Sequence, residues 1–286
     1  MNILQALKNT VSYLKLNTRQ SLEESKIEAD TILTRVLNLS KPSLYKNYDD
    51  QLDKISQRKI KDILYLRKNG TPLSYILESH TFYDDNFFVN KSVLIPRPET
   101  EYIVDKIIKY GDLVYKRKNR CLFLDAGTGS GCVGITIAKQ RPHWNIFLSD
   151  LYMDTLKVAK INAKKAKNVN LICADWLSTF ADNSVDFIFS NPPYIPLSDE
   201  YIEESVENNE PLSALFSGVD GLDDIRKIIS LSKNILSSSG VLFLEYGFKQ
   251  SDEVSSLLDI NDFTDIKVHL DYNGMERFSS CQKSYG

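Results

Sequence analysis

The second half of the chain alternates short apolar runs with amphipathic segments, and this alternation restricts the fold more than any other feature. Apolar runs bounded by polar turns predict buried strands, and apolar residues spaced three or four apart predict helices. The predicted strands are 121–125, 145–149, 169–173, 185–190, 240–245, 263–269 and 276–281, and the predicted helices are 131–140, 153–166, 222–236 and 252–258. This pattern predicts an α/β fold: a doubly wound, mostly parallel sheet of seven strands, with an edge hairpin formed by the last two.

Residues 1–80 show a different pattern, with helical spacing throughout and no strand signal. Apolar residues predict a helix over 2–16, a second that starts at the Ser21–Glu24 capping box and is ended by Pro42, and a third over 52–68. Ile55 is expected on the inward face of the third helix. The segment is therefore predicted to form a small helical bundle.

A β-hairpin linker is predicted between the two parts, because aromatic and β-branched residues flank the turn sequence Asp84-Asp85-Asn86. The predicted domains are thus a helical domain (1–80), a hairpin linker (81–95) and a catalytic domain (96–286). The catalytic domain is predicted to begin with a helix over 102–110. The cationic run 116–120 is predicted to be a solvated loop before the first strand.

Composition excludes several classes of protein. The four cysteines lie far apart and the three histidines are isolated, so no metal site and no disulfide framework is expected. No apolar run reaches the ~18 residues of a membrane span, and the N-terminus does not resemble a signal peptide, so we expect a cytoplasmic protein without membrane contact. Residues 1–80 hold 13 Lys and Arg against 9 Asp and Glu, whereas residues 81–286 hold 22 against 29. The acidic second part argues against direct nucleic-acid binding.

A glycine-rich loop follows the first predicted strand. Gly129, Gly131 and Gly134 fit the pattern G-x-G-x-x-G, and Asp150 lies 21 residues after Gly129. Glycines let the backbone approach a ligand closely at the start of a helix. The same spacing fits a dinucleotide such as NAD, so the loop alone leaves the ligand open.

Acidic residues at three successive strand ends favour a cationic nucleoside over a diphosphate. Asp125, Asp150 and Asp175 end or follow the first three strands, and the glycine loop contains no Lys or Arg. A carboxylate beside the loop would repel a pyrophosphate but would attract the ammonium and sulfonium groups of S-adenosyl-L-methionine (SAM). Asp150 would then accept the ribose hydroxyls, Asp175 the adenine amino group, and the Trp176 indole would pack on the base. SAM is therefore favoured over NAD.

The fourth strand ends in Ser190-Asn191-Pro192-Pro193-Tyr194. Consecutive prolines cannot continue a sheet ladder, and a residue before proline is driven to an extended conformation. The result is a stiff polar tip at the carboxyl end of a strand, where open α/β sheets bind their ligands. The tip offers an amide, free carbonyls and an aromatic face, which together could hold a planar group that carries an N–H₂.

Several further segments carry a family resemblance. They are Pro72-Leu73-Ser74-Tyr75-Ile76-Leu77, Ile95-Pro96-Arg97-Pro98-Glu99-Thr100-Glu101, Glu210-Pro211-Leu212-Ser213-Ala214-Leu215, Gly218-Val219-Asp220-Gly221-Leu222 and Leu244-Glu245-Tyr246-Gly247. Together with the glycine loop and Asn-Pro-Pro-Tyr, they make the chain resemble the peptide chain release factor glutamine methyltransferase family (PrmC or HemK). This resemblance implies a helical release-factor-docking domain, a hairpin linker and a SAM-dependent domain.

The resemblance also implies the reaction and the site. The substrate would be the glutamine of a Gly-Gly-Gln motif in class I release factors, which act in translation termination. The enzyme would methylate the side-chain amide nitrogen and release S-adenosyl-L-homocysteine. Asn191 and Pro192 would hold the amide, with Pro193 and Tyr194 packing on it. Arg97 and Glu99 would either line the pocket or simply begin a helix. The residues expected to hold SAM are Asp125, Gly127, Thr128, Gly129, Ser130, Gly131, Asp150, Asp175, Trp176 and Asn191.

Three other interpretations remain at this point. An adenine-amino nucleic-acid methyltransferase would share the Asn-Pro-Pro-Tyr tip, but it predicts a target-recognition insertion and a basic cleft. A non-catalytic SAM or nucleotide sensor predicts a degraded tip, whereas this one is complete. An NAD-dependent oxidoreductase would be distinguished by which of the two ligands raises the melting temperature.

Overall fold

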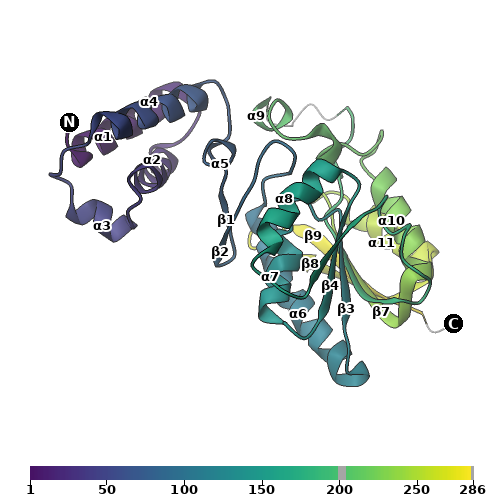
Figure 1. Ribbon diagram of the computed structural model, residues 1–286. Coiled ribbons are helices and arrows are strands. Elements are labelled where there is room, and N and C mark those ends of the chain that lie inside the picture. The colour runs from purple at the N-terminus through teal and green to yellow at the C-terminus, as the bar shows by residue number, and fades with distance from the viewer. Residues whose placement is uncertain (199–203, 285–286) are drawn as a thin grey trace. The chain divides into compact units, whose positions relative to one another are not determined.

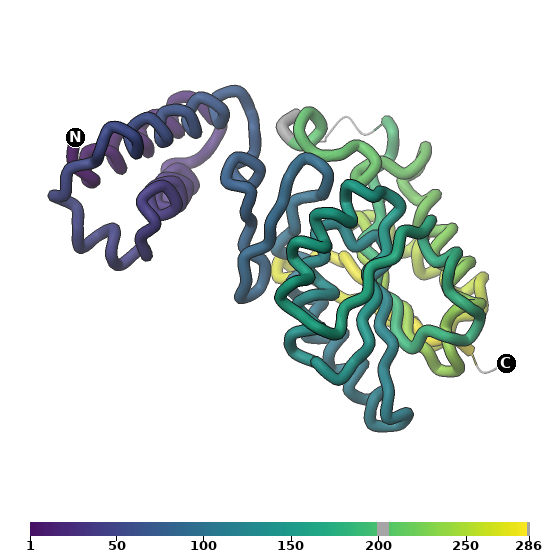
Figure 2. Tube along the Cα trace, viewed as in Figure 1, coloured from purple at the N-terminus to yellow at the C-terminus, as the bar shows by residue number. Residues whose placement is uncertain are grey.

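The computed structural model describes residues 1–198 and 204–284, which fold into two compact units. Residues 1–79 and 204–209 form the first unit, and the remaining described residues from His80 onward form the second. Figures 1 and 2 trace the chain through both. None of the described helices has the length and apolar character needed to cross a membrane.

The first unit is helical. Its helices are α1 (Ile3–Asn17), α2 (Leu22–Leu37), α3 (Lys41–Lys46), α4 (Lys54–Lys68), α5 (Leu73–Ile76) and α9 (Glu204–Glu207). Helices α1, α2 and α4 pack together, and aliphatic side chains such as Leu14, Ile32 and Ile60 are buried between them. The Ser21 hydroxyl caps α2 and the Glu24 carboxylate accepts the Ser21 N–H, which confirms the predicted capping box.

Two details of this unit differ from the prediction. Helix α2 ends at Leu37 because Asn38 adopts a left-handed conformation (φ 53°), and Pro42 lies in the first turn of the next helix. The prediction that Pro42 ends α2 was therefore wrong. Ile55 is 69% exposed rather than inward, because it lies on the outer side of α4, whose buried side is formed by Ser56, Ile60, Ile63 and Leu64.

The linker hairpin is shorter than predicted. Strand β1 (His80–Phe82) pairs with β2 (Asp85–Phe87), and Phe82 is opposite Asp85, so Tyr83 and Asp84 form the turn. The prediction of Asp84-Asp85-Asn86 as the turn was wrong, because Tyr83 takes a left-handed conformation (φ 55°) that closes a two-residue loop. Phe82 and Phe87 are buried and meet edge to face, which ties the hairpin to the core of the second unit.

The second unit is built on a seven-stranded sheet of order β5-β4-β3-β6-β7-β9-β8. The strands are β3 (Leu122–Ala126), β4 (Asn145–Asp150), β5 (Val169–Cys173), β6 (Val185–Ser190), β7 (Leu236–Glu245), β8 (Phe263–Leu270) and β9 (Glu276–Lys283). The first five in the sheet order are parallel, and β9 and β8 form the antiparallel edge. The predicted doubly wound, mostly parallel sheet is confirmed.

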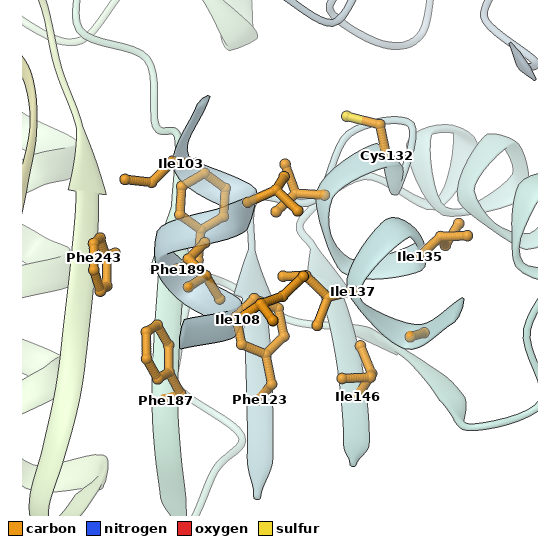
Figure 3. Packing of buried hydrophobic residues seen from close by; sticks show 14 of the residues in the cluster. Ile103, Ile108, Phe123, Cys132, Ile135, Ile137, Ile146, Phe187, Phe189 and Phe243 are labelled. Atoms are coloured by element: carbon orange, nitrogen blue, oxygen red, sulfur yellow. The ribbon is translucent and has the colours of Figure 1, made fainter. Parts of the chain in front are cut away.

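Helices cover both faces of this sheet (Figure 1). Helices α6 (Pro98–Lys118), α7 (Cys132–Gln140) and α8 (Met153–Ala163) lie on one face, and α10 (Asp223–Ile235) and α11 (Ser251–Ile260) lie on the other. A short 3₁₀ turn, Leu212–Ala214, precedes α10. Strand β6 alternates between the two cores: Phe187 and Phe189 face α6, while Val185 and Ile188 face α10. Figure 3 shows Phe187 and Phe189 next to Phe123 of the neighbouring strand.

Helix α6 is twice as long as predicted. It runs over 21 residues, and Asn119 ends it in a left-handed conformation (φ 51°). Most of the cationic run 116–120 is therefore the last turn of a helix, which suits the negative end of the helix dipole, and not a loop. Lys118 lies 2.7 Å from the buried Asp186 carboxylate, so this cation has a structural partner.

Gly111 lies where α6 crosses Trp144, and we expect Gly111→Ala to destabilise the second unit. A Cβ at position 111 would lie 2.1 Å from the Trp144 ring. Alanine normally stabilises a helix by about 1 kcal/mol relative to glycine, but overpacking costs ~1–3 kcal/mol. We expect the melting temperature, measured by circular dichroism, to drop by several degrees. Lys109→Ala, at an exposed position of the same helix, should leave the melting temperature nearly unchanged. An unchanged melting temperature for Gly111→Ala would contradict the packing argument.

Candidate active site

A cavity of about 510 Å³ opens at the carboxyl ends of the central strands. It lies between β3 and β6, where the strand order changes direction. Strands β4 and β5 follow β3 on one side, and β7 follows β6 on the other. Open α/β sheets bind ligands at such a switch point. The glycine loop after β3 and the Asn191 tip after β6 both line this cavity.

The glycine loop passes close beneath the cavity because three glycines take left-handed conformations. The φ angles of Gly127, Gly129 and Gly131 are 72°, 57° and 81°. A Cβ at Gly127 would lie 2.8 Å from the Trp176 ring, so only glycine fits there. The loop leads directly into α7, which begins at Cys132 and directs its free N–H groups toward the cavity end of the sheet.

Asp125 is a buried carboxylate at the base of the loop, with 3% of its surface exposed. Its Oδ2 accepts the Thr128 hydroxyl at 2.8 Å and the Gly134 N–H at 3.0 Å. Both hydrogen bonds that Asp125 accepts from the described residues end on Oδ2, which leaves Oδ1 for a ligand. Burial raises the pKa of Asp125 to about 6, and the nearby Asp150 charge adds to the shift.

Asp150 ends β4 on the opposite side of the loop. It accepts the backbone N–H groups of Gly129 and Tyr152, each at 3.1 Å. Burial raises the pKa of Asp150, while these hydrogen bonds oppose the shift. The carboxylate is thus fixed at the cavity wall, and its predicted role as the acceptor of a ribose stays a prediction.

Asp175 and Trp176 line the far end of the cavity, but each has a protein partner that the sequence did not indicate. Lys227 donates to both Asp175 oxygens, at 2.8 and 2.6 Å. The Trp176 indole donates to Asp224 at 3.0 Å. Lys227 and Asp224 belong to α10, far from residue 175 in the sequence, and no local pattern distinguished them from other surface charges of that helix. An adenine amino group would therefore have to share Asp175 with Lys227.

The Asn-Pro-Pro-Tyr tip is anchored to β3 at its start and to Gln250, the residue before α11, at its end. The Ser190 hydroxyl donates to the Ala126 carbonyl at 2.7 Å, which fixes the start of the tip to β3. Asn191 and Pro193 line the cavity, whereas Pro192 and Tyr194 are not among its lining residues. The Tyr194 carbonyl accepts the Gln250 amide at 3.0 Å, and burial raises the pKa of the Tyr194 phenol. The roles predicted for these side chains stay predictions.

Arg97 combines the two roles that were left open for it. It is the residue immediately before α6, and its side chain also lines the cavity. Its guanidinium lies 2.8 Å from the buried Glu210 carboxylate, which also accepts the Ile95 N–H at 3.1 Å. Glu99 lies in the first turn of α6 and is not among the lining residues.

The chain resembles known proteins in both sequence and fold. The PrmC N-terminal domain family matches residues 5–77, and the methyltransferase small domain family matches residues 113–204. The release factor glutamine methyltransferase of Francisella tularensis is 37% identical over 263 residues, which cover 91% of this chain and 92% of that protein. The enzyme of the same name from Coxiella burnetii is 34% identical over 285 residues and covers 99% of both chains.

A solved structure with a similar fold is the hMettl16 catalytic domain in complex with the MAT2A 3′UTR hairpin 6. It covers 70% of this chain and 75% of its own, with a TM-score of 0.50 and 16% sequence identity. At this level of identity the likeness concerns the fold alone. It agrees with the arrangement of strands described above.

The raised pKa of Asp125 predicts a pH dependence of stability. Its folded-state pKa of about 6 lies above the value of 3.8 expected for an unfolded chain, so the folded protein binds the proton more tightly. Its contribution to stability therefore declines as the pH rises from about 4 to 6, by an amount on the order of 3 kcal/mol. We expect Asp125→Asn to flatten the decline of melting temperature between pH 4 and pH 6.5.

The matched control is Asp154→Asn, since the Asp154 side chain is 74% exposed. Its melting temperature should follow the pH dependence of the unmodified protein. Equal slopes for the Asp125→Asn variant and the unmodified protein would show that Asp125 does not bind its proton more tightly in the folded state.

Proposed function

The chain belongs to the release factor glutamine methyltransferase family, and from this premise we propose how its site works and what it acts on. Membership makes it a methyltransferase of release factor glutamine. The finer proposals are that SAM is the methyl donor, that the glutamine is that of the Gly-Gly-Gln motif in class I release factors, and that the reaction takes place in the cytoplasm. The observation that supports SAM as the donor and a planar N–H₂ group as the acceptor is that Asp125 and Asn191 line one cavity at the switch point of the sheet.

The residues around the cavity fit a cationic nucleoside. The volume of about 510 Å³ lies within the range of ~300–1,000 Å³ that small-molecule sites occupy. Asp125 offers a free buried oxygen, and the loop residues 126–134 contain no Lys or Arg that could neutralise a pyrophosphate. We assign the methionine end of SAM to Asp125 and the loop Gly127–Gly131, the ribose to Asp150, and the adenine to Asp175 and Trp176. When bound, SAM supplies an electrophilic methyl group on its sulfonium.

At the acceptor end, the protein positions the substrate amide and supplies hydrogen-bond acceptors for it. An amide nitrogen is a weak nucleophile, because its lone pair is delocalised into the carbonyl. The Asn191 side-chain oxygen and the Pro192 carbonyl accept the two N–H groups of the substrate amide, which fixes the nitrogen and favours its pyramidalisation. Arg97 and Pro193 complete the wall around the acceptor, and Tyr194 supports the tip from behind. No strong base is required, because the proton can leave after the methyl transfer.

Docking of the release factor is assigned to residues 1–80 as a proposal, supported by their net charge of +4 against the −7 of residues 81–286. Opposite charge favours steering of an acidic partner surface toward the first unit. The acidic second unit would discourage competing polyanions. With docking assigned to residues 1–80, the cavity of the second unit is left for the Gly-Gly-Gln segment.

The substrate can be tested directly with SAM labelled in its methyl group. We expect label on a full-length class I release factor and none on duplex DNA. Mass spectrometry should place the added methyl on the glutamine of Gly-Gly-Gln, and a release factor with that glutamine replaced by alanine should stay unlabelled. Label on DNA alone would favour an adenine-amino methyltransferase and would overturn the proposal.

The positioning model predicts that Asn191→Ala abolishes methyl transfer. Loss of one fixed acceptor should lower kcat by at least about a hundredfold, while SAM affinity falls far less than kcat and the melting temperature stays near its original value. Transfer is measured with labelled SAM, and SAM affinity by calorimetry. Asn170→Ala, in β5, removes an exposed amide from the same sheet and should leave transfer unchanged. Unaltered turnover in Asn191→Ala would contradict the positioning model.

A further inference from the structure

A buried carboxylate, Glu245, lies directly behind the acceptor end of the cavity. It ends β7, one residue beyond Leu244, which pairs with Ser190 of β6. Only 2% of its surface is exposed, and it is not among the residues that line the cavity. The proposed reaction gives this group no direct part, although an isolated buried carboxylate is costly to maintain.

The partners of Glu245 explain what it does to the tip. Its Oε2 accepts the Thr100 hydroxyl at 2.8 Å. Asn191 follows Ser190, the register partner of Leu244, so its side chain lies beside the Glu245 carboxylate, and as a hydrogen-bonding neighbour it lowers the pKa of that carboxyl. A carboxylate can only accept hydrogen bonds, so the Asn191 amide must take part through its Nδ2–H₂ group. The Asn191 Oδ1 is therefore the end of the amide that remains for the cavity.

This contact fixes an orientation that shape alone does not fix. The oxygen and nitrogen ends of an asparagine amide are nearly identical in size, so a half-turn of the amide exchanges an acceptor for a donor. In the reversed orientation, the Asn191 N–H₂ would face the N–H₂ of the substrate, and two donors repel one another. Selection of a glutamine side chain over a glutamate depends on the oxygen end facing the cavity.

We propose that Glu245 is a positioning residue, which binds the Asn191 Nδ2–H₂ group and thereby directs Asn191 Oδ1 toward the amide hydrogens of the acceptor. This inference rests on the proposed function for the identity of the acceptor. Thr100 holds the other side of the carboxylate, so that the first turn of α6 also contributes to the orientation of Asn191. A role for α6 in the site was predicted only through Arg97 and Glu99.

The surroundings of Glu245 make this orientation sensitive to pH. Among the described residues, the titratable groups that interact with it electrostatically include Arg277 of β9, Glu99 of α6, the Tyr194 phenol and the Cys132 thiol of α7. Of these four groups, Arg277 is the one whose charge favours the charged form of Glu245. Burial raises the pKa of Glu245 to about 7, and the Thr100 hydrogen bond opposes the shift only in part. Below that pH the carboxyl gains a donor of its own, which can turn the Asn191 amide around, so turnover should rise as the pH increases through about 7.

Two substitutions separate positioning from structural support. Glu245→Leu fills the same space without an acceptor, and it should lower kcat for release-factor methylation by about a hundredfold while SAM affinity is retained. Glu245→Gln carries an acceptor and a donor at every pH, as the protonated carboxyl does. Its kcat should stay at the low value that the unmodified protein shows below pH 7, and it should lose the dependence on pH around 7. A kcat of Glu245→Gln at the high-pH value of the unmodified protein, or a pH profile that matches the unmodified protein, would overturn the proposal.

Asp186→Asn serves as the matched control, because it neutralises another fully buried carboxylate near the start of β6, away from the cavity. It should lower the melting temperature but leave kcat and its pH profile unchanged.

A second measurement does not need the methylation assay. The side-chain N–H₂ resonances of Asn191, assigned by their loss in Asn191→Asp, should titrate with a midpoint near pH 7 in the unmodified protein and not in Glu245→Gln. Absence of methylation in the unmodified protein would refute the proposed function alone, whereas Asn191 resonances that do not titrate would refute the role of Glu245.

Discussion

The pairing of β3 with β6 is the constraint on which the rest of the site depends. Ala126 and Ser190 are partners in register at the ends of these strands, and the Ser190 hydroxyl binds the Ala126 carbonyl. Because the strands are parallel neighbours on either side of the switch point, the glycine loop and the asparagine tip emerge side by side. A slip of one residue would turn Phe187 and Phe189 to the wrong face, so the two aromatic cores protect the register.

The carboxyl end of the sheet accumulates buried acids whose charged forms the fold itself disfavours. Burial raises the pKa of Asp125, Asp150 and Glu245, and their protein partners are mostly neutral donors. A chain selected for stability alone would replace such groups by apolar residues, since uncompensated buried charge is costly. Clusters of perturbed carboxyls in a cavity are typical of functional sites, and here the proposed ligand supplies the missing positive charge.

The sequence predicted what depends on local pattern and missed what depends on distant contact. Strands β5 and β6 and the Ser21 capping box follow from short-range spacing, and the structure has them as predicted. The partners of Asp175 and Glu245 lie 52 and 145 residues away, so no spacing rule could have found them. The predicted position of the hairpin turn was wrong because Tyr83 adopts a left-handed conformation. The predicted helix was too short because it stopped before Gly111, a residue whose place in α6 is explained only by its packing against Trp144.

Asp125 and Glu245 have similar burial but opposite tasks at the two ends of one cavity. Asp125 keeps an oxygen open toward the cavity, so a cation can meet its charge directly. Glu245 is separated from the cavity by Asn191, so its charge acts only through the orientation of a neutral amide. A carboxylate in direct contact with the substrate amide would accept its hydrogens, but it is too weak a base to remove one, and it would leave an uncompensated charge in the acceptor pocket. An intervening asparagine held at its nitrogen end presents a neutral acceptor oxygen in a fixed direction, which suits a weak, planar nucleophile that needs position more than a base.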